Sequence, residues 1–147
     1  MEIVNREAKF NYFIEEELEC GISLVGTEIK SIRDGKANLK DSYAIIRNNE
    51  VYLLNMYIGE YKEGSLFNHD PRRTRKLLLH KSEISKLKKG IEQEGKTLVP
   101  LKLYFSKNRA KILLALCKGK KQYDKRETIK ERDIKREEAK LHKLNYR

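Results

Sequence analysis

Alternation of apolar and polar residues near the N-terminus most constrains the fold of this chain. In residues 12–24 the even positions are mostly apolar and include Ile14, Leu18 and Cys20, whereas the odd positions are mostly glutamate, glycine or serine. Because successive side chains of a β-strand point to opposite faces, this period of two predicts a long strand with one buried face. Glu16 falls on the apolar side of the pattern, which indicates a bulge or a strand end there.

Five further strands are indicated by shorter apolar segments. Residues 43–58 contain two of them, separated by Asn48-Asn49, and asparagine tolerates the positive φ angles of tight hairpins. Residues 77–79 predict a short strand, and residues 98–105 and 110–117 predict a final hairpin.

Two segments change to a helical period. In residues 27–33 the isoleucines lie three apart, Thr27 is placed to cap the start of a helix, and Gly35 is placed to end it. A second helix is expected to be capped by Ser82 and to end before Gly95, because its apolar residues share one face and its lysines lie elsewhere.

About six short strands and two helices therefore fall within residues 1–117, with residues 59–76 as the longest loop. Many short antiparallel strands favour a closed sheet, because closure removes exposed strand edges. We expect a mainly β fold, an OB-like closed antiparallel barrel of about six strands with two short helices. An open α+β sheet is the alternative.

The composition changes at Lys118. Residues 118–147 carry 12 Lys and Arg against 6 Asp and Glu, a net charge of +6, and their aliphatic residues form one narrow helical stripe. Such a stripe buries too little surface to offset the loss of backbone entropy, about 1–2 kcal/mol per residue. We therefore expect a domain at residues 1–117 and a basic C-terminal tail at residues 118–147, disordered when free and helical when bound to a partner.

The charge of the whole chain favours a nucleic-acid partner. Its 33 Lys and Arg against 22 Asp and Glu give a net charge of +11, an excess that suits RNA or DNA better than a membrane. The longest apolar run, residues 112–117, is far below the roughly 20 residues that cross a bilayer, and we expect no signal peptide. Cys20 and Cys117 are too few for a disulfide framework, so we expect reduced thiols in a cytoplasmic protein.

The sequence contains no strong catalytic motif. It has no glycine-rich phosphate loop, no Gly-x-Ser-x-Gly and no zinc-ligand spacing. The pair His69-Asp70 would suit a metal-dependent nuclease, but an aspartate before Pro71 is more typical of a turn. We therefore expect no enzyme activity, no metal and no cofactor. The nuclease is one alternative function, and a ribosomal protein or general RNA chaperone is the other.

Two basic clusters indicate RNA contacts more strongly. Residues 71–76 place four cations within five positions, just before a predicted strand. Residues 118–126 combine five cations with Tyr123. Cations neutralise phosphates and release counterions, and a tyrosine ring can stack on a base.

Three residues outside these clusters are further candidates. Leu78 should point outward if Leu77 points into the core, which leaves it available to RNA or to an apolar partner. Glu19 either pairs with a nearby arginine or accepts hydrogen bonds from base amino groups. Lys111 opens the last strand, where it is either an ordinary exposed residue or a phosphate contact.

Five motifs in the same order along the chain resemble those of the bacterial SmpB (small protein B) family. Together they make a specific signal, and the similarity extends from about Asn5 over nearly the whole chain. The motifs are YFIEE at residues 12–16, GTEIKSIR at 26–33, GKANLKDSY at 35–43, DP at 70–71 with TRKLLL at 74–79, and KGKK at 118–121 followed by DKR at 124–126.

This resemblance implies a non-enzymatic RNA-binding protein with an OB-type barrel. Family members bind the tRNA-like domain of transfer-messenger RNA (tmRNA) and, with elongation factor Tu, bring it to stalled ribosomes. Trans-translation then tags the nascent chain and releases the ribosome. The tail is implied to occupy the decoding centre of the small subunit and the empty mRNA channel, which predicts that it senses an unoccupied channel.

The resemblance also implies roles for individual residues. Glu19, Leu78 and Lys111 match positions that contact the tRNA-like domain, and residues 124–126 match a tail signature tied to function on the ribosome. With the first basic cluster, the expected RNA-binding residues are Glu19, Arg72, Arg73, Arg75, Lys76, Leu78 and Lys111. The residues expected in the decoding centre and channel are Lys118, Gly119, Lys120, Lys121, Tyr123, Asp124, Lys125, Arg126, Lys130 and Arg132. Many relatives have histidine at the position of Tyr123, so this chain lacks an imidazole proton donor there.

Overall fold

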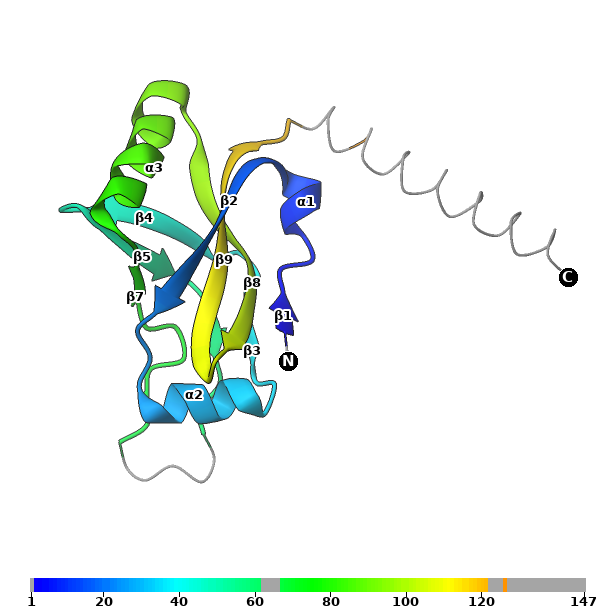
Figure 1. The fold of residues 1–147 in the computed structure, drawn as a ribbon. Helices are drawn as coiled ribbons and strands as arrows, with labels where there is room; N and C mark the ends of the chain where they lie inside the picture. The colour runs from blue at the N-terminus through cyan, green and yellow to red at the C-terminus, as the bar shows by residue number, and fades with distance from the viewer. Residues whose placement is uncertain (1, 62–66, 122–125, 127–147) are drawn as a thin grey trace, which may run out of the picture.

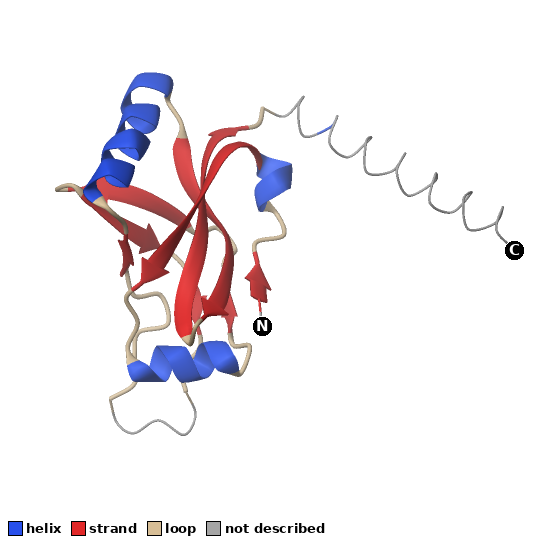
Figure 2. Cartoon of the chain, viewed as in Figure 1, coloured by secondary structure: helices blue, strands red, loops and turns tan. Residues whose placement is uncertain are grey.

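The computed structural model describes residues 2–61, 67–121 and 126 of the chain (Figure 1). Strands predominate among them, and α2 and α3 lie near opposite ends of the strands (Figure 2). The elements in chain order are β1 (Glu2–Val4), α1 (Ala8–Asn11), β2 (Tyr12–Ile22), α2 (Gly26–Arg33), β3 (Ala37–Asn38), β4 (Tyr43–Arg47), β5 (Glu50–Leu54), β6 (Tyr57–Ile58), β7 (Arg75–Leu78), α3 (Lys81–Glu94), β8 (Thr97–Ser106) and β9 (Arg109–Gly119).

Six strands form a ring of antiparallel pairings. Neighbouring strands pair in the order β1-β8-β4-β5-β7-β2-β9. Because β9 also pairs with β8, the six strands from β8 to β9 close into a ring. The start of β8 pairs with β4 at Leu98, whereas residues 102–104 of β8 pair with β1. The prediction of a mainly β, antiparallel fold is confirmed. A separate two-stranded sheet joins β3 and β6.

The strand predictions from local patterns are confirmed in their main features. The β2–β9 register shifts between Ile14 and Glu16, at the place where the sequence indicated a bulge. Asn48 and Asn49 have φ angles of 53° and 59° and join β4 to β5 in a tight hairpin.

The predicted helix starts need correction. Val25, and not Thr27, is the N-cap of α2, and its N–H donates to the Glu28 carboxylate at 2.9 Å. Thr27 is held elsewhere, because its hydroxyl bonds to the ring of His69. Helix α3 begins at Lys81 with His80 as N-cap, so Ser82 lies inside its first turn.

The predicted glycine stops are confirmed. Gly35 and Gly95 follow the two helices with φ angles of 75° and 65°, a conformation that glycine adopts without steric cost. The short elements β1, α1 and β3 were not expected from the sequence, and the second strand predicted within residues 43–58 is divided at Asn55 into β5 and the short β6. Each of these short elements has at most four residues, too few to show a period.

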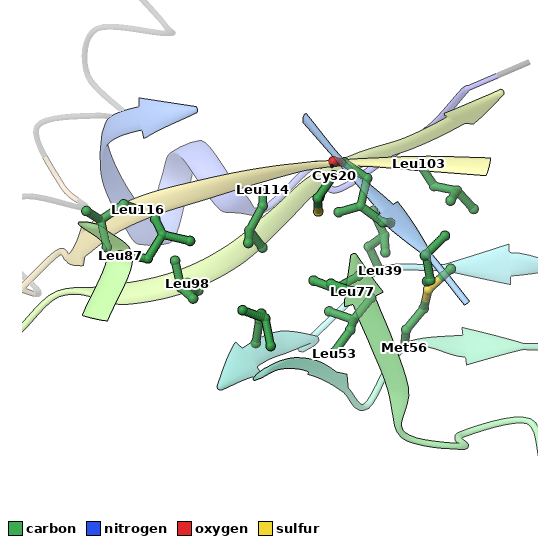
Figure 3. Close-up of a cluster of buried hydrophobic side chains, with 14 of the residues drawn as sticks. Cys20, Leu39, Leu53, Met56, Leu77, Leu87, Leu98, Leu103, Leu114 and Leu116 are labelled. Carbon is green, nitrogen blue, oxygen red and sulfur yellow. Dashed lines mark hydrogen bonds between the residues drawn. The ribbon is translucent and has the colours of Figure 1, made fainter. Parts of the chain in front are cut away.

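The core fills the interior of the strand ring. Leu53, Leu77, Leu98, Leu103 and Leu114 come from four strands and are at most 1% exposed (Figure 3). The side chains of α3 that face this core close it from one end.

The two cysteines are unpaired and buried in the described structure, as expected for core thiols. Burial raises the pKa of Cys20 and of Cys117 to about 12, so both thiols stay protonated and unreactive at neutral pH. Among the described residues, no helix has the length and apolar character that crossing a bilayer requires.

Candidate nucleic-acid interface

Three predicted RNA-binding residues that are distant in the sequence meet on one face. Glu19 lies on β2, Leu78 on β7 and Lys111 on β9. Gly21 of β2 pairs with Leu78 on one side and with Lys111 on the other, and Glu19 lies two residues before Gly21 on the same face of the strand. Glu19, Leu78 and Lys111 line one hollow of about 490 Å³, together with Lys76, His80 and Lys81.

Leu78 points outward, as the alternation predicted. It is 54% exposed, whereas Leu77 beside it is 1% exposed. The absence of a side chain at Gly21 leaves room for it, because a Cβ atom there would lie 3.3 Å from both Leu78 Cβ and Leu78 Cδ1. The large apolar side chain of Leu78 is therefore held in a defined place on the surface and does not pack in the core.

Among the described residues, Glu19 is bound by a tyrosine and not by an arginine. The hydroxyl of Tyr104, on β8, donates a hydrogen bond to Oε2 of Glu19. Partial burial and this hydrogen bond raise the pKa of Tyr104 to about 12. The sequence reasoning missed Tyr104, although its place among alternating residues of the predicted strand 98–105 marks it as facing outward.

Two cations of the first basic cluster lie on the surface. Arg72 Nη1 donates to the backbone O and the side-chain Oδ1 of Asn55, each at 3.1 Å. Lys76 Nζ lies 2.9 Å from Oε1 of Glu50, and both side chains are more than 40% exposed. Both cations therefore have weak, solvated partners that a phosphate could replace.

The other two cations form a buried ion pair with Glu28. Arg75 is fully buried, and its Nε lies 2.5 Å from Glu28 Oε2 while its Nη1 donates to the Met56 carbonyl at 2.7 Å. Arg73 Nη2 lies 2.6 Å from Glu28 Oε1, with about a third of its side chain exposed. Arg75 cannot contact RNA from this position, which corrects the sequence prediction. It anchors the start of β7 to α2.

Glu28 stays charged in this buried site. Burial alone would raise its pKa, but hydrogen bonds from Arg73, from the Val25 backbone and from Arg75 outweigh burial and place the pKa of Glu28 below its usual range.

The pair His69-Asp70 has a structural role. The ring of His69 is buried between the Thr27 hydroxyl and the Ile58 carbonyl. The Asp70 carboxylate accepts the N–H of Arg72 at 2.9 Å, which is the turn that the sequence predicted. Within the described ranges, no three His, Cys, Asp or Glu side chains gather as a metal site would require.

The second basic cluster begins at the far end of β9. Lys118 and Gly119 pair with the first residues of β2, about 23 Å along the strand from Lys111. The N–H of Lys120 donates to the Asn11 carbonyl at 2.8 Å, and its ammonium lies 4.8 Å from the centre of the Phe13 ring. Lys121 follows, and Arg126 is exposed. The remaining predicted tail residues, Tyr123, Asp124, Lys125, Lys130 and Arg132, lie outside the described residues.

Known proteins are similar to this chain over most of its length. The family model described as "SmpB protein" matches residues 2–144. The "SsrA-binding protein" of Trichodesmium erythraeum is 61% identical over 133 residues, which cover 90% of this chain and 85% of the relative. That of Clostridium acetobutylicum is 60% identical over 133 residues, which cover 90% and 86%.

A solved structure is similar in both fold and sequence. It is described as "tmRNA-SmpB: a journey to the center of the bacterial ribosome", and one of its chains matches with a TM-score of 0.69 and 51% identity, over 82% of this chain and 85% of that chain. The family match spans almost all of the sequence, and the relatives exceed half identity over most of their own length. This chain belongs to the SmpB family.

Proposed function

We propose that this chain binds the tRNA-like domain of tmRNA and brings it to stalled ribosomes for trans-translation. The observation that carries the proposal is the meeting of Glu19, Leu78 and Lys111 on one face, from three strands that are far apart in the sequence. The names of the relatives, which are SsrA-binding proteins, and of the solved tmRNA-SmpB structure support it. The protein acts without catalysis, as a cytoplasmic RNA-binding partner.

Each residue of this face suits a different part of an RNA. The Lys111 ammonium neutralises a phosphate, and the Glu19 carboxylate accepts hydrogen bonds from base amino groups. Leu78 packs on an unstacked base or on a ribose, since the unpaired bases of RNA loops are open to contact with protein side chains. Lys76 adds a cation to this face, because it lines the same hollow. Arg72 and the exposed third of the Arg73 side chain add cations in the segment just before β7.

The strand ring provides a rigid support for this face. We interpret the ring of six strands as an OB-like closed barrel, since its pairings return from β9 to β8. On such a support the outward side chains of β7, β2 and β9 keep fixed spacings, so one folded RNA can be recognised by its shape.

The tail completes the proposed function on the ribosome. Its 30 residues span about 45 Å as a helix and about 100 Å when extended, so the tail can extend well beyond the domain and probe the decoding centre and the empty mRNA channel. Messenger RNA in that channel would exclude the tail by steric overlap, which makes the tail a sensor of stalling. Elongation factor Tu is the expected partner in delivery.

An RNA-binding titration tests the role of the face. The full chain should bind the tRNA-like domain at least tenfold more tightly than a hairpin RNA of equal length. Leu78→Ala and Lys111→Ala should each weaken binding by about 1–3 kcal/mol, or roughly 5- to 150-fold. Lys89→Ala on α3, another exposed lysine, should leave binding unchanged. Equal affinity for both RNAs would favour the general RNA chaperone instead.

A tagging assay on stalled ribosomes tests the role of the tail. A chain truncated after Lys121 should bind the tRNA-like domain as the full chain does, because the face of Glu19, Leu78 and Lys111 is intact. It should nevertheless fail to support tagging. Normal tagging by the truncated chain would refute the role proposed for the tail.

A further inference from the structure

We propose that Tyr104 is a positioning residue that holds the carboxylate of Glu19 away from Lys111, so that both charged groups remain available to RNA. This inference rests on the proposed function, because it assigns a role to a residue beside the same RNA-binding face.

Glu19 and Lys111 are placed where an ion pair would be expected. In the β2–β9 register Glu19 is opposite Leu113 and Gly21 is opposite Lys111, so Glu19 and Lys111 are diagonal neighbours on one face. Diagonal neighbours in an antiparallel pair lie within reach of long side chains. In the described part of the chain, however, no ion pair joins them, and the side chain of Lys111 makes no hydrogen bond or ion pair.

Tyr104 accounts for this separation. It is paired directly with Lys111 across β8 and β9, on the opposite side of Lys111 from β2. Its side chain therefore reaches over β9 to donate its hydroxyl to Glu19. The Glu19 carboxylate is thus hydrogen-bonded to a neutral group two strands away, although the cation of Lys111 lies on the adjacent strand.

The position of the Tyr104 ring is itself supported. Lys102 Nζ lies 5.2 Å from the centre of the ring and 3.3 Å from Oε1 of Glu2 on β1. Side chains of β1, β8 and β2 therefore form one connected row on this face. Such a row limits the rotamers of Tyr104 and so fixes where its hydroxyl points.

A tyrosine suits this task because it binds a carboxylate without neutralising it. With its raised pKa, the Tyr104 hydroxyl keeps its proton at neutral pH and remains a donor. Glu19 keeps its charge and its remaining lone pairs, and Lys111 keeps its three N–H donors. An ion pair between Glu19 and Lys111 would instead remove one cation from the set that releases counterions when RNA binds.

The decisive variant is Tyr104→Phe in the full chain, titrated with the tRNA-like domain at several salt concentrations. Loss of the hydroxyl lets Glu19 turn to Lys111, so affinity at low salt should fall by roughly three- to tenfold. The slope of log K against log salt should become shallower by up to about one unit, as for Lys111→Ala. Tyr43→Phe, at another exposed tyrosine, should change neither quantity.

A second background separates positioning from a merely structural effect. In the Glu19→Gln variant, the side chain at position 19 carries no charge that could pair with Lys111. Adding Tyr104→Phe to this variant should therefore leave the slope of log K against log salt unchanged. If Tyr104→Phe weakens binding equally in both backgrounds without changing the slope, the positioning role is overturned.

An NMR measurement without RNA tests the inference separately from the proposed function. The Hε protons of Lys111 should come close to the Hγ protons of Glu19 in Tyr104→Phe and not in the unmodified chain. If Lys111 stays apart from Glu19 in the variant, the inference fails whether or not the chain binds tmRNA. If the contact forms but the unmodified chain shows no preference for the tRNA-like domain, the proposed function fails and the separation of charges by Tyr104 stands.

Discussion

Glu28→Gln removes one charge from the buried ion pair and nearly preserves the shape of the side chain. Arg75 is fully buried, and its Nε lies 2.5 Å from Glu28 Oε2, so the substitution leaves a guanidinium without a counter-charge in the core. Breaking a buried ion pair on one side costs about 3–5 kcal/mol. Arg75 keeps its hydrogen bond to the Met56 carbonyl, so we expect the free energy of unfolding to fall by about 3 kcal/mol, near the lower end of this range.

Urea denaturation followed by circular dichroism measures this loss, since the chain contains no tryptophan. The midpoint should fall while the slope of the transition stays constant, and the melting temperature should drop by about 10 °C. Glu17→Gln is the matched control, because Glu17 is exposed on β2, and it should change stability by less than about 0.5 kcal/mol. If Glu28→Gln were as stable as this control, the buried ion pair would not hold α2 to β7 as argued.

Three further predictions address the acid stability, the RNA face and the tail. Because the pKa of Glu28 is lowered on folding, its contribution to stability is complete above the unfolded pKa of about 4.3 and is lost as pH falls through the folded pKa. Thermal melts below about pH 4 should therefore show acid destabilisation that is smaller in Glu28→Gln. Gly21→Ala should displace Leu78 and weaken RNA binding by roughly three- to tenfold, which is part of the about 1.5–3 kcal/mol that burial of a leucine side chain provides. An RNA titration equal to that of the unmodified chain would contradict this prediction. Alanine at each of residues 124–126 should preserve binding of the tRNA-like domain and abolish tagging, and equal loss of both would contradict the division between face and tail.

Features set by neighbouring residues were predictable from the sequence. Asn48-Asn49 marked a hairpin because asparagine tolerates positive φ, and Glu16 marked a bulge because it broke the alternation. Leu78 was expected to point outward because Leu77 points inward. Glu19 and Lys111 were candidates because of their charge and the family resemblance, but only the register of β7, β2 and β9 places them beside Leu78.

Features set by distant partners were missed. The basic cluster was judged by its charge, but Arg75 lies two residues before Leu77 and shares its inward face, so alternation carried a signal that it is buried. Its partner Glu28 is 47 residues away, and no local pattern pairs the two. The prediction that Thr27 caps α2 was wrong for the same reason. The hydroxyl of Thr27 bonds to His69, which lies 42 residues further along the chain.

Site-directed photocrosslinking is the most direct test of the central claim that β7, β2 and β9 present the RNA-binding face. Cys20 and Cys117 are buried, so Leu78→Cys places a single reactive thiol on the surface for a photoactivatable label. Ile45→Cys, at a 36% exposed position on β4, is the control. On irradiation, the tRNA-like domain should crosslink to the label at position 78 and not to the label at position 45. Equal crosslinking from both positions, or crosslinking from position 45 alone, would contradict the account.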